Sequence, residues 1–411
     1  MDNLPPNLLI VNAAQVVTPA KEWNLKVIKN GAVAVRDGKI VDIGRTGDVI
    51  YRVEPGAETL IIDAAGKIVM PGFVDPHTHL VYAGSRAEEF TLRLQGVPYM
   101  EIASRGGGIN STVKATRKAS LDDLVDSAKA RLARMFAWGT TTAEVKSGYA
   151  LNHAGELKML MTIQQLALEQ PVELVPTYMG AHEFPPEYQE KRGEYVDLLV
   201  KTLIPEIGKK WLAEFCDVFT EKGVFSVDDS RRILEAAKEA GLMLKIHADE
   251  IVHLGGAELA AEVGAVSADH LVHVSPEGMD AMKRAGVVPV ILPGASFFLN
   301  SDFAPARAMI ERGLPVALGT DLNPGTCTIE SMPIIIGLAC LKLKLTPEEA
   351  IIASTLNAAK AIRRDSIIGS LEVGKQADML IMKISDYREI PYRFGVNPVD
   401  MVIKKGKLVR Q

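Results

Sequence analysis

The sequence has few cysteines and no marked excess of charge of either sign. Its three cysteines among 411 residues form no pair at metal-finger spacing, as a reducing compartment would permit. They are Cys216, Cys327 and Cys340. With 46 Lys and Arg against 51 Asp and Glu, the net charge is −5, which gives no broad attraction to nucleic-acid phosphates or anionic lipids. We therefore expect a small-molecule partner and neither nucleic acid nor membrane.

The sequence also lacks a long apolar run and a visible secretory signal. The most apolar later stretch, residues 333–345, is interrupted by Lys342 and Lys344 and is shorter than the roughly 20 residues that a spanning helix needs. Residues 1–6 are polar and contain proline, unlike a basic segment leading into an apolar one. A cytoplasmic protein is expected.

Both ends of the chain have the texture of β structure. Short apolar runs alternate with turn signals at residues 8–17, 32–36, 39–43, 60–62 and 67–69, and again at 379–382 and 401–403. The length suits a barrel of about 250 residues plus a smaller domain. The two ends are therefore expected to build one small β-sandwich domain, from residues 1–67 and 365–411.

Between these ends, eight strand-like runs alternate with helical segments, which is typical of parallel strands with crossover helices. The runs end near His77–His79, Lys146, His182, Glu221, Glu250, His270, Ser296 and Asp321. Helix N-caps are indicated at Ser120, Ser226 and Thr346. The pattern predicts an α/β fold with a (β/α)₈ TIM-like barrel over residues 68–364. The alternative is an open doubly wound sheet, but no G-x-G-x-x-G turn follows the first run.

Histidines gather at the ends of these runs, where barrels build their active sites. His77 and His79 end the first run, and residues two apart on a strand face the same side, so both can bind one metal ion. An isolated H-x-H also occurs by chance, as a pair of surface or hydrogen-bonded histidines. Its position at a strand end favours the metal site.

Two further ligands are expected from later runs. His247 ends the fifth run and would supply a third nitrogen, although alone it would be better explained as a core histidine. Asp321 follows the eighth run, where an unpaired buried carboxylate would be costly without a cation or hydrogen bonds. The predicted metal ligands are therefore His77, His79, His247 and Asp321.

This ligand set predicts hydrolytic chemistry. Three neutral imidazoles and one carboxylate leave the ion a net positive charge and room for water, which then forms hydroxide near neutral pH. Asp321 can accept the water proton and pass it to a departing nitrogen. His270 is expected to orient the water or polarise a carbonyl, with metal ligation or a structural hydrogen bond as alternatives. A second metal would need a bridging carbamate, for which Lys222 is the nearest candidate, and one metal is favoured.

The histidines, Asp321 and the tail GSLEVGKQAD at residues 369–378 resemble the amidohydrolase superfamily over essentially the whole chain. Five longer sequence segments resemble, more specifically, the branch of this superfamily that opens the imidazolone ring in histidine breakdown. The matching phrases are DPHTHLVYAGSR (75–86), GGGI (106–109), KSGY (146–149), HADE (247–250) and TDLNPG (320–325).

The resemblance implies one zinc or ferric ion per subunit, a homodimer, and the substrate 4-imidazolone-5-propanoate. Metal-bound hydroxide would attack the ring carbonyl carbon and cleave the cyclic amide, giving N-formimidoyl-L-glutamate. The implied catalytic residues are Asp321, His270 and Glu250. The implied substrate contacts are Arg86, Tyr149, His182, Glu250, Asn323, Gly325 and Thr326.

Simpler explanations stand beside several of these roles. Arg86 suits a propanoate tail, but could instead pair with Glu88 or Glu89. Asn323 and its neighbours could hold the substrate or merely form a turn. Glu250 could bind a ring nitrogen or be a helix-terminal charge. The glycines at 106–108 could form a closing loop or a passively flexible one.

Two other functions use the same scaffold. A ring deaminase would release ammonia from an exocyclic amine with the same kind of metal site. A catalytically silent binding scaffold would show gaps among the metal ligands, and this sequence shows none.

Overall fold

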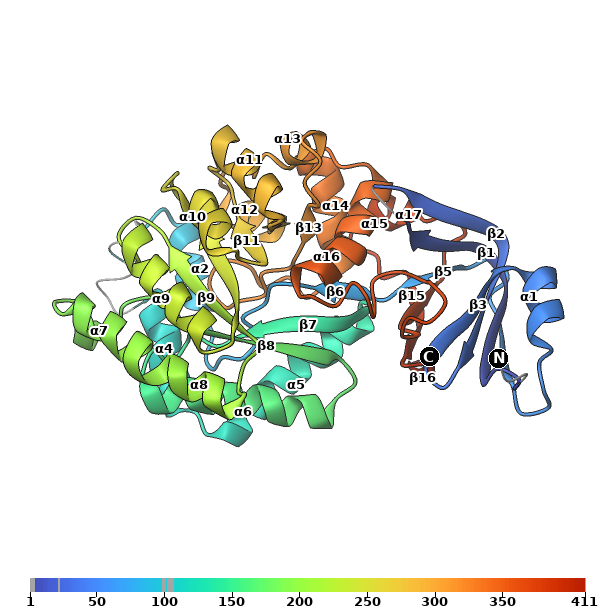
Figure 1. Ribbon diagram of the computed structural model, residues 1–411, viewed down its shortest axis with the longest axis horizontal. Helices are drawn as coiled ribbons and strands as arrows, with labels where there is room; N and C mark the ends of the chain where they lie inside the picture. The colour runs from blue at the N-terminus through green and yellow to red at the C-terminus, as the bar shows by residue number, and fades with distance from the viewer. Residues whose placement is uncertain (1–3, 21–22, 98–100, 102–106, 411) are drawn as a thin grey trace.

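The chain forms two parts, a barrel and a smaller sheet (Figure 1). In the computed structural model, the described residues are 4–20, 23–97, 101 and 107–410. None of the described helices has the length and apolar character needed to cross a bilayer.

The larger part is a parallel eight-stranded barrel. Hydrogen bonding follows the order β13-β12-β11-β10-β9-β8-β7-β6, and an isolated parallel bridge between Thr78 and Leu322 joins the segments that follow the two outermost strands. The strands are β6 (Phe73–Asp75), β7 (Thr140–Lys146), β8 (Glu173–Ala181), β9 (Phe215–Thr220), β10 (Met243–Ala248), β11 (Ser267–His270), β12 (Val288–Ile291) and β13 (Ala317–Leu318). The predicted (β/α)₈ barrel is confirmed.

Helices surround this barrel (Figure 1). The segments between strands contain α2 (Ala87–Leu94), α4 (Ile109–Lys118), α5 (Leu121–Ala137), α6 (His153–Glu169), α7 (Arg192–Leu198), α8 (Ile204–Lys210), α9 (Val227–Glu239), α10 (Gly256–Val263), α11 (Pro276–Ala285), α12 (Pro293–Leu299) and α13 (Ala306–Glu311). After β13 come α14 (Met332–Leu343), α15 (Pro347–Ala353) and α16 (Leu356–Ala361). The predicted caps are confirmed, since the Ser120, Ser226 and Thr346 side chains each accept a hydrogen bond from the backbone three residues on.

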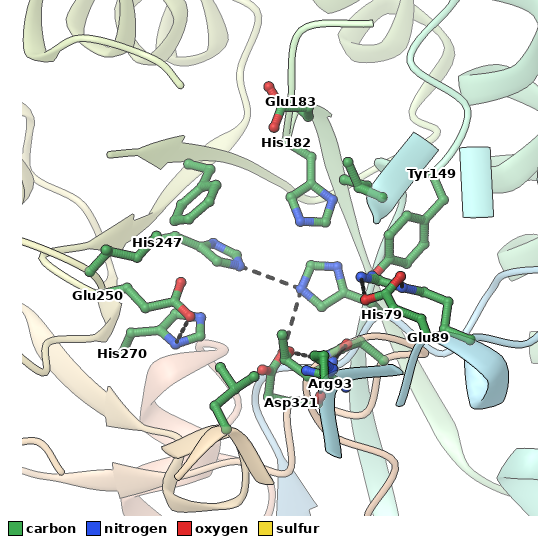
Figure 2. A pocket seen from close by; sticks show the side chains of 17 residues that line it. His79, Glu89, Arg93, Tyr149, His182, Glu183, His247, Glu250, His270 and Asp321 are labelled. Carbon is green, nitrogen blue, oxygen red and sulfur yellow. Dashed lines mark hydrogen bonds and ion pairs between the residues drawn. The ribbon is translucent and has the colours of Figure 1, made fainter. Parts of the chain in front are cut away.

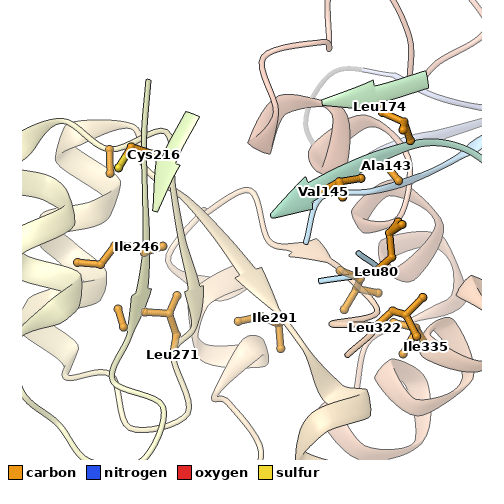
Figure 3. Packing of buried hydrophobic residues seen from close by; sticks show 14 of the residues in the cluster. Leu80, Ala143, Val145, Leu174, Cys216, Ile246, Leu271, Ile291, Leu322 and Ile335 are labelled. Carbon is orange, nitrogen blue, oxygen red and sulfur yellow. The ribbon is translucent and has the colours of Figure 1, made fainter. Parts of the chain in front are cut away.

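Toward their carboxyl ends, β7 and β10 alternate between apolar residues that face the helices and polar residues that face the barrel interior. Ala143 and Val145 of β7 and Ile246 of β10 belong to one large hydrophobic cluster with the surrounding helices (Figure 3). Because successive strand residues point to opposite faces, Glu144 and Lys146 point into the barrel. Both side chains are completely buried. The interior therefore contains charged groups at the end where the histidines lie.

The smaller part is a mixed sheet made from both chain ends. Its strands are β1 (Leu8–Pro19), β2 (Leu25–Arg36), β3 (Lys39–Arg45), β4 (Leu60–Asp63), β5 (Ile68–Pro71), β14 (Met379–Met382), β15 (Val399–Lys404) and β16 (Lys407–Arg410). Antiparallel pairing of β5 with β14 joins the two ends of the chain. A bridge between Lys39 and Gln376 brings β3 back to the segment before β14, so the hydrogen-bonded sheet curls around its own core. The expected small β domain is present as one continuous sheet rather than two separate layers.

Three local features differ from the sequence-based expectations. The first barrel run divides at Gly72 into β5, which lies in the small sheet, and β6, which lies in the barrel. A Cβ on Gly72 would lie 2.2 Å from Thr141 Oγ1, so only glycine fits this crossing. The seventh run ends at Ile291 rather than near residue 296, because Pro293 opens α12. The helices α1 (Thr46–Val53) and α17 (Glu389–Tyr392) lie in regions for which only β structure was expected.

The N-cap of α5, predicted at Ser120, can be tested by substitution. Ser120→Ala removes one half of a reciprocal cap with Asp123 and should lower the free energy of unfolding by about 1 kcal/mol. Urea denaturation followed by far-UV circular dichroism measures it. Ser301→Ala, which removes a hydroxyl from an exposed residue outside any helix, is the control. Equal stability of the two variants would contradict the assignment.

Candidate active site

Three histidines and an aspartate meet at the carboxyl end of the barrel. His77 and His79 directly follow β6, and His247 lies on β10. One ring nitrogen from each of the three lies within 4.8 Å of the others. The Nε2 atoms of His79 and His247 are 3.4 Å apart. Asp321 Oδ1 lies 3.5 Å from His77 Nε2 and 3.7 Å from His79 Nε2.

Buried carboxylates orient two of these rings. His77 Nδ1 donates to Asp269 Oδ2 at 2.6 Å, and His247 Nδ1 is 3.1 Å from Asp217 Oδ1. With the Nδ1 proton engaged in this way, each neutral ring presents the lone pair of Nε2 to the shared space. Burial lowers the pKa of His77 well below its usual value, which favours this neutral form.

The donor set fits a metal ion. Among the described residues, His77 Nε2 is a buried atom without a hydrogen-bond partner. Ligands about 2.1 Å from a tetrahedral ion lie roughly 3.4 Å from one another, close to the 3.4–3.7 Å separations found here. Burial, together with the carboxyl of Glu250, raises the pKa of Asp321 well above its usual value, so its charged form calls for a nearby cation. The four residues form a candidate site for one ion.

A second cluster, of His77, His270 and Asp321, overlaps the first. One ligand atom from each also lies within 4.8 Å of the others. The backbone of His270 has φ 74° and that of Asp321 has φ 53°, a left-handed conformation that costs non-glycine residues roughly 1–3 kcal/mol. These bends occur where each side chain enters the site.

A layer of buried charges lies beneath the histidines. Lys146 Nζ is 2.7 Å from both Glu144 and Asp217, and 3.8 Å from Asp269. Lys245 Nζ donates to the Pro76 carbonyl at 2.9 Å and lies 3.7 Å from Asp269. Burial alone would raise the pKa of Asp217, but the Lys146 charge and the hydrogen bonds from His247 and Lys146 hold it well below its usual value. Lys146 thus helps to keep the Asp217 carboxylate ionised, and Lys245 places a second cation beside Asp269.

A pocket of about 420 Å³ opens above this cluster (Figure 2). His79, His247, His270 and Asp321 form its polar floor. The remaining lining residues are Arg86, Glu89, Arg93, Ile109, Tyr149, His182, Glu183, Phe219, Glu250, Ile251, Leu299, Asn323 and Thr326. Of the predicted site residues, only His77, which is completely buried, and Gly325 do not line it.

Arg86 lies in the pocket wall and is paired. Its guanidinium donates through Nε to Glu89 Oε2 at 2.9 Å and through Nη2 to Glu89 Oε1, so the expected alternative of a salt bridge is found. The Glu89 carboxylate also accepts from the backbone of Gly108 at 2.8 Å. Arg86 Nη1 takes part in neither bond to Glu89 and is the group available to a ligand.

Asn323, Gly325 and Thr326 form a tight turn after β13. Asn323 Oδ1 accepts from the backbone of Gly325 at 2.8 Å and of Thr326 at 2.7 Å. Its Nδ2 donates to the Asp321 carbonyl and to Thr326 Oγ1, each at 2.7 Å. The Asn323 side chain is therefore engaged in the turn, which holds Gly325 against Arg86.

Tyr149 and His182 lie on one wall, with ring centroids 5.2 Å apart. Burial raises the pKa of Tyr149 above its usual value, so its hydroxyl stays protonated. Burial, with His247 nearby, lowers the pKa of His182 to about 3. Its Nδ1 is 3.1 Å from the Gly148 carbonyl and donates to it. In the neutral ring, Nε2 then carries the lone pair and faces away from Gly148.

Glu250 lies in the loop after β10 and before α10, so it is not a helix-terminal charge. Its Oε1 is 3.5 Å from His270 Nδ1 (Figure 2). Burial raises the pKa of Glu250 to about 7. This carboxyl is thus placed to exchange a proton near neutral pH.

Lys222 and the glycines at 106–108 were two further candidates from the sequence. Lys222 is exposed in a turn after β9, so it is not positioned to bridge two metals among the buried histidines. Of the glycines at 106–108, Gly106 lies outside the described residues.

Several residues of the site were missed. No role was assigned from the sequence to Asp217, Asp269 or Lys245. Lys146 was noted only as a run end and in the phrase KSGY, and Glu89 only as a possible partner of Arg86. Charged residues inside otherwise apolar strands were the available signal, because burying a charge requires a partner.

Known proteins resemble this chain over nearly its whole length. The model of the amidohydrolase family matches residues 68–409. A protein named imidazolonepropionase from Symbiobacterium thermophilum is 53% identical over 98% of this chain and 97% of its own length. Another of that name, from Alkaliphilus oremlandii, is 53% identical over 97% of each chain. The chain belongs to the imidazolonepropionase family of amidohydrolases.

Solved structures show the same fold. An adenosine deaminase from Xanthomonas campestris with bound zinc has a TM-score of 0.73 and 22% identity, covering 99% of this chain and 93% of its own. A guanine deaminase from E. coli has a TM-score of 0.74 and 16% identity, covering 98% of each chain. These similarities show that the chain has the same fold as these structures.

The carboxylate that orients His247 gives a metal-binding test. Asp217→Asn should weaken zinc binding about 10- to 100-fold, since the amide orients the imidazole less strongly and lacks the charge. Calorimetric titration of zinc into metal-depleted protein measures the affinity. Asp126→Asn, an exposed change of the same kind on α5, is the control. Unchanged zinc affinity in the Asp217 variant would refute the orienting role.

Substitution of Gly325 tests whether Arg86 forms part of the substrate-binding wall of the pocket. A Cβ at this position would lie 2.1 Å from Arg86 Nη1, so Gly325→Ala should displace the guanidinium and raise KM about tenfold with a smaller change in kcat. Steady-state kinetics with the substrate proposed below measures both. Gly193→Ala on α7, an exposed position where a Cβ would meet nothing within 4 Å, is the control. Unaltered KM would place Arg86 outside the binding wall.

Proposed function

We propose that this chain hydrolyses 4-imidazolone-5-propanoate to N-formimidoyl-L-glutamate with one zinc or ferric ion. The observation that carries the proposal is the cluster of ring nitrogens of His77, His79 and His247, with the Asp321 carboxylate within 4 Å of the first two rings. The names of the relatives supply the ring chemistry. His77, His79, His247 and Asp321 would hold the ion, which when bound acidifies water and polarises a carbonyl.

The reaction adds water across the cyclic amide. The carbonyl carbon gains a hydroxyl oxygen, the bond from that carbon to the ring nitrogen breaks, and the nitrogen leaves with a proton. Asp321, on the pocket floor, would take the proton from water and return it to the departing nitrogen. His270 would orient the water or the carbonyl from the same floor, and Glu250, beside it, would hydrogen-bond a ring nitrogen.

The opposite side of the pocket suits the propanoate tail. Arg86 Nη1 and the Tyr149 hydroxyl are donors, and a carboxylate prefers charged and paired donors of this kind. His182, whose ring stacks on His79 and is also close to the Tyr149 ring, would contact the substrate ring. The turn of Asn323, Gly325 and Thr326 would support Arg86 and border the ring.

The function is tested by following the substrate with purified enzyme. Loss of ring absorbance should match formation of formimidoylglutamate, without release of ammonia. Removing the metal with a chelator should abolish turnover, and adding back zinc or iron should restore it, because the ion would acidify the attacking water. Ammonia release from an amino-substituted ring, with no opening of the imidazolone, would indicate a deaminase instead. Full turnover in metal-free protein would overturn the metal assignment.

A further inference from the structure

A completely buried glutamate lies under the loop that carries Tyr149. Glu156 is in the first turn of α6, and its Oε1 accepts from the backbone of Ala150 at 2.9 Å and Leu151 at 2.8 Å. Its Oε2 accepts from the backbone of Gly148 at 3.0 Å, and the Ser147 hydroxyl donates to the same carboxylate. One carboxylate thus holds the two residues before Tyr149 and the two residues after it.

The carbonyl groups of the same loop are held from the other side. Arg117 Nε donates to the Ala150 carbonyl at 2.6 Å, and its Nη2 donates to the Leu151 carbonyl at 3.2 Å. Arg117 also pairs with Glu187 at 2.7 Å near the surface. The loop is therefore clamped between a buried anion on its N–H groups and a cation on its carbonyls.

Gly148 connects this clamp to a second pocket residue. Its carbonyl accepts from His182 Nδ1, so the position of Gly148 sets the tautomer and tilt of that ring. The backbone here has φ 101°, and a Cβ would lie 2.7 Å from the Met179 carbonyl. The contact between loop and β8 is close, and a small shift of Gly148 would move His182.

We propose that Glu156 is a positioning residue for substrate binding: it holds Tyr149 and, through the Gly148 carbonyl, His182 in the orientation that the substrate meets. This inference rests on the proposed function for the identity of the substrate. Glu156 itself does not line the pocket among the described residues. A purely structural capping role would affect stability alone, whereas positioning affects KM and the His182 ring.

Glu156→Gln discriminates between these roles. The amide keeps an oxygen for Ala150 and Leu151 but turns an NH₂ group toward the Gly148 N–H, so that one bond is replaced by a clash of donors. In the metal-loaded enzyme we expect KM to rise about tenfold with kcat changed less than threefold. Glu169→Gln, at the exposed end of the same helix, should leave both unchanged.

A second readout needs no turnover. In ¹⁵N-histidine-labelled, metal-loaded protein without substrate, the His182 ring signals should shift in Glu156→Gln and not in Glu169→Gln. Loss of the signals in His182→Asn assigns them. If the wild-type enzyme fails to open the imidazolone ring, the proposed function fails, while these signals still decide the positioning of His182.

Arg117→Ala keeps the test decisive if Glu156→Gln does not fold. This side chain is partly exposed, and its loss frees the Ala150 and Leu151 carbonyls, so KM and the His182 signals should change in the same direction. Glu187→Gln removes the surface pair alone and should behave as wild type. Folded Glu156 or Arg117 variants with wild-type KM and unshifted His182 signals would overturn the proposal.

Discussion

The active site depends on hydrogen bonds between two histidine Nδ1 atoms and buried carboxylates. Asp269 and Asp217 fix the rings of His77 and His247 so that both Nε2 lone pairs face the same space. Without these bonds each ring could rotate or change tautomer, and the nitrogens would no longer converge. The arrangement of the histidines therefore depends on carboxylates inside the barrel as well as on residues at the carboxyl ends of the strands.

Burying those carboxylates requires compensation, and Lys146 and Lys245 provide it. An isolated buried charge is costly, but here each ammonium group lies within 4 Å of Asp269, and Lys146 also contacts Asp217. The period of two along β7 and β10 makes this arrangement compatible with folding, because the intervening residues, such as Val145 and Ile246, face the helices. The same strands thus supply both the apolar packing and the charged support.

The candidate metal ligands were largely predictable from the sequence. The buried charged residues that orient them were not. His77, His79, His247 and Asp321 follow apolar runs directly, and strand ends in a barrel meet at one face. Asp217 and Lys146 sit inside such runs, and a single sequence does not show which inward-facing residues of different strands contact one another. For the same reason, the pairing of Arg86 with Glu89 stood only as an alternative, and Lys222 was considered although it points to solvent.

The central claim is that one metal ion sits among these four side chains at the pocket floor. A crystal structure of the metal-loaded protein, with anomalous data at the metal absorption edge, tests this most directly. The account predicts one anomalous peak, bounded by Nε2 of His77, His79 and His247 and by Asp321 Oδ1. A peak elsewhere, two peaks in the site, or no peak in fully active protein would contradict it.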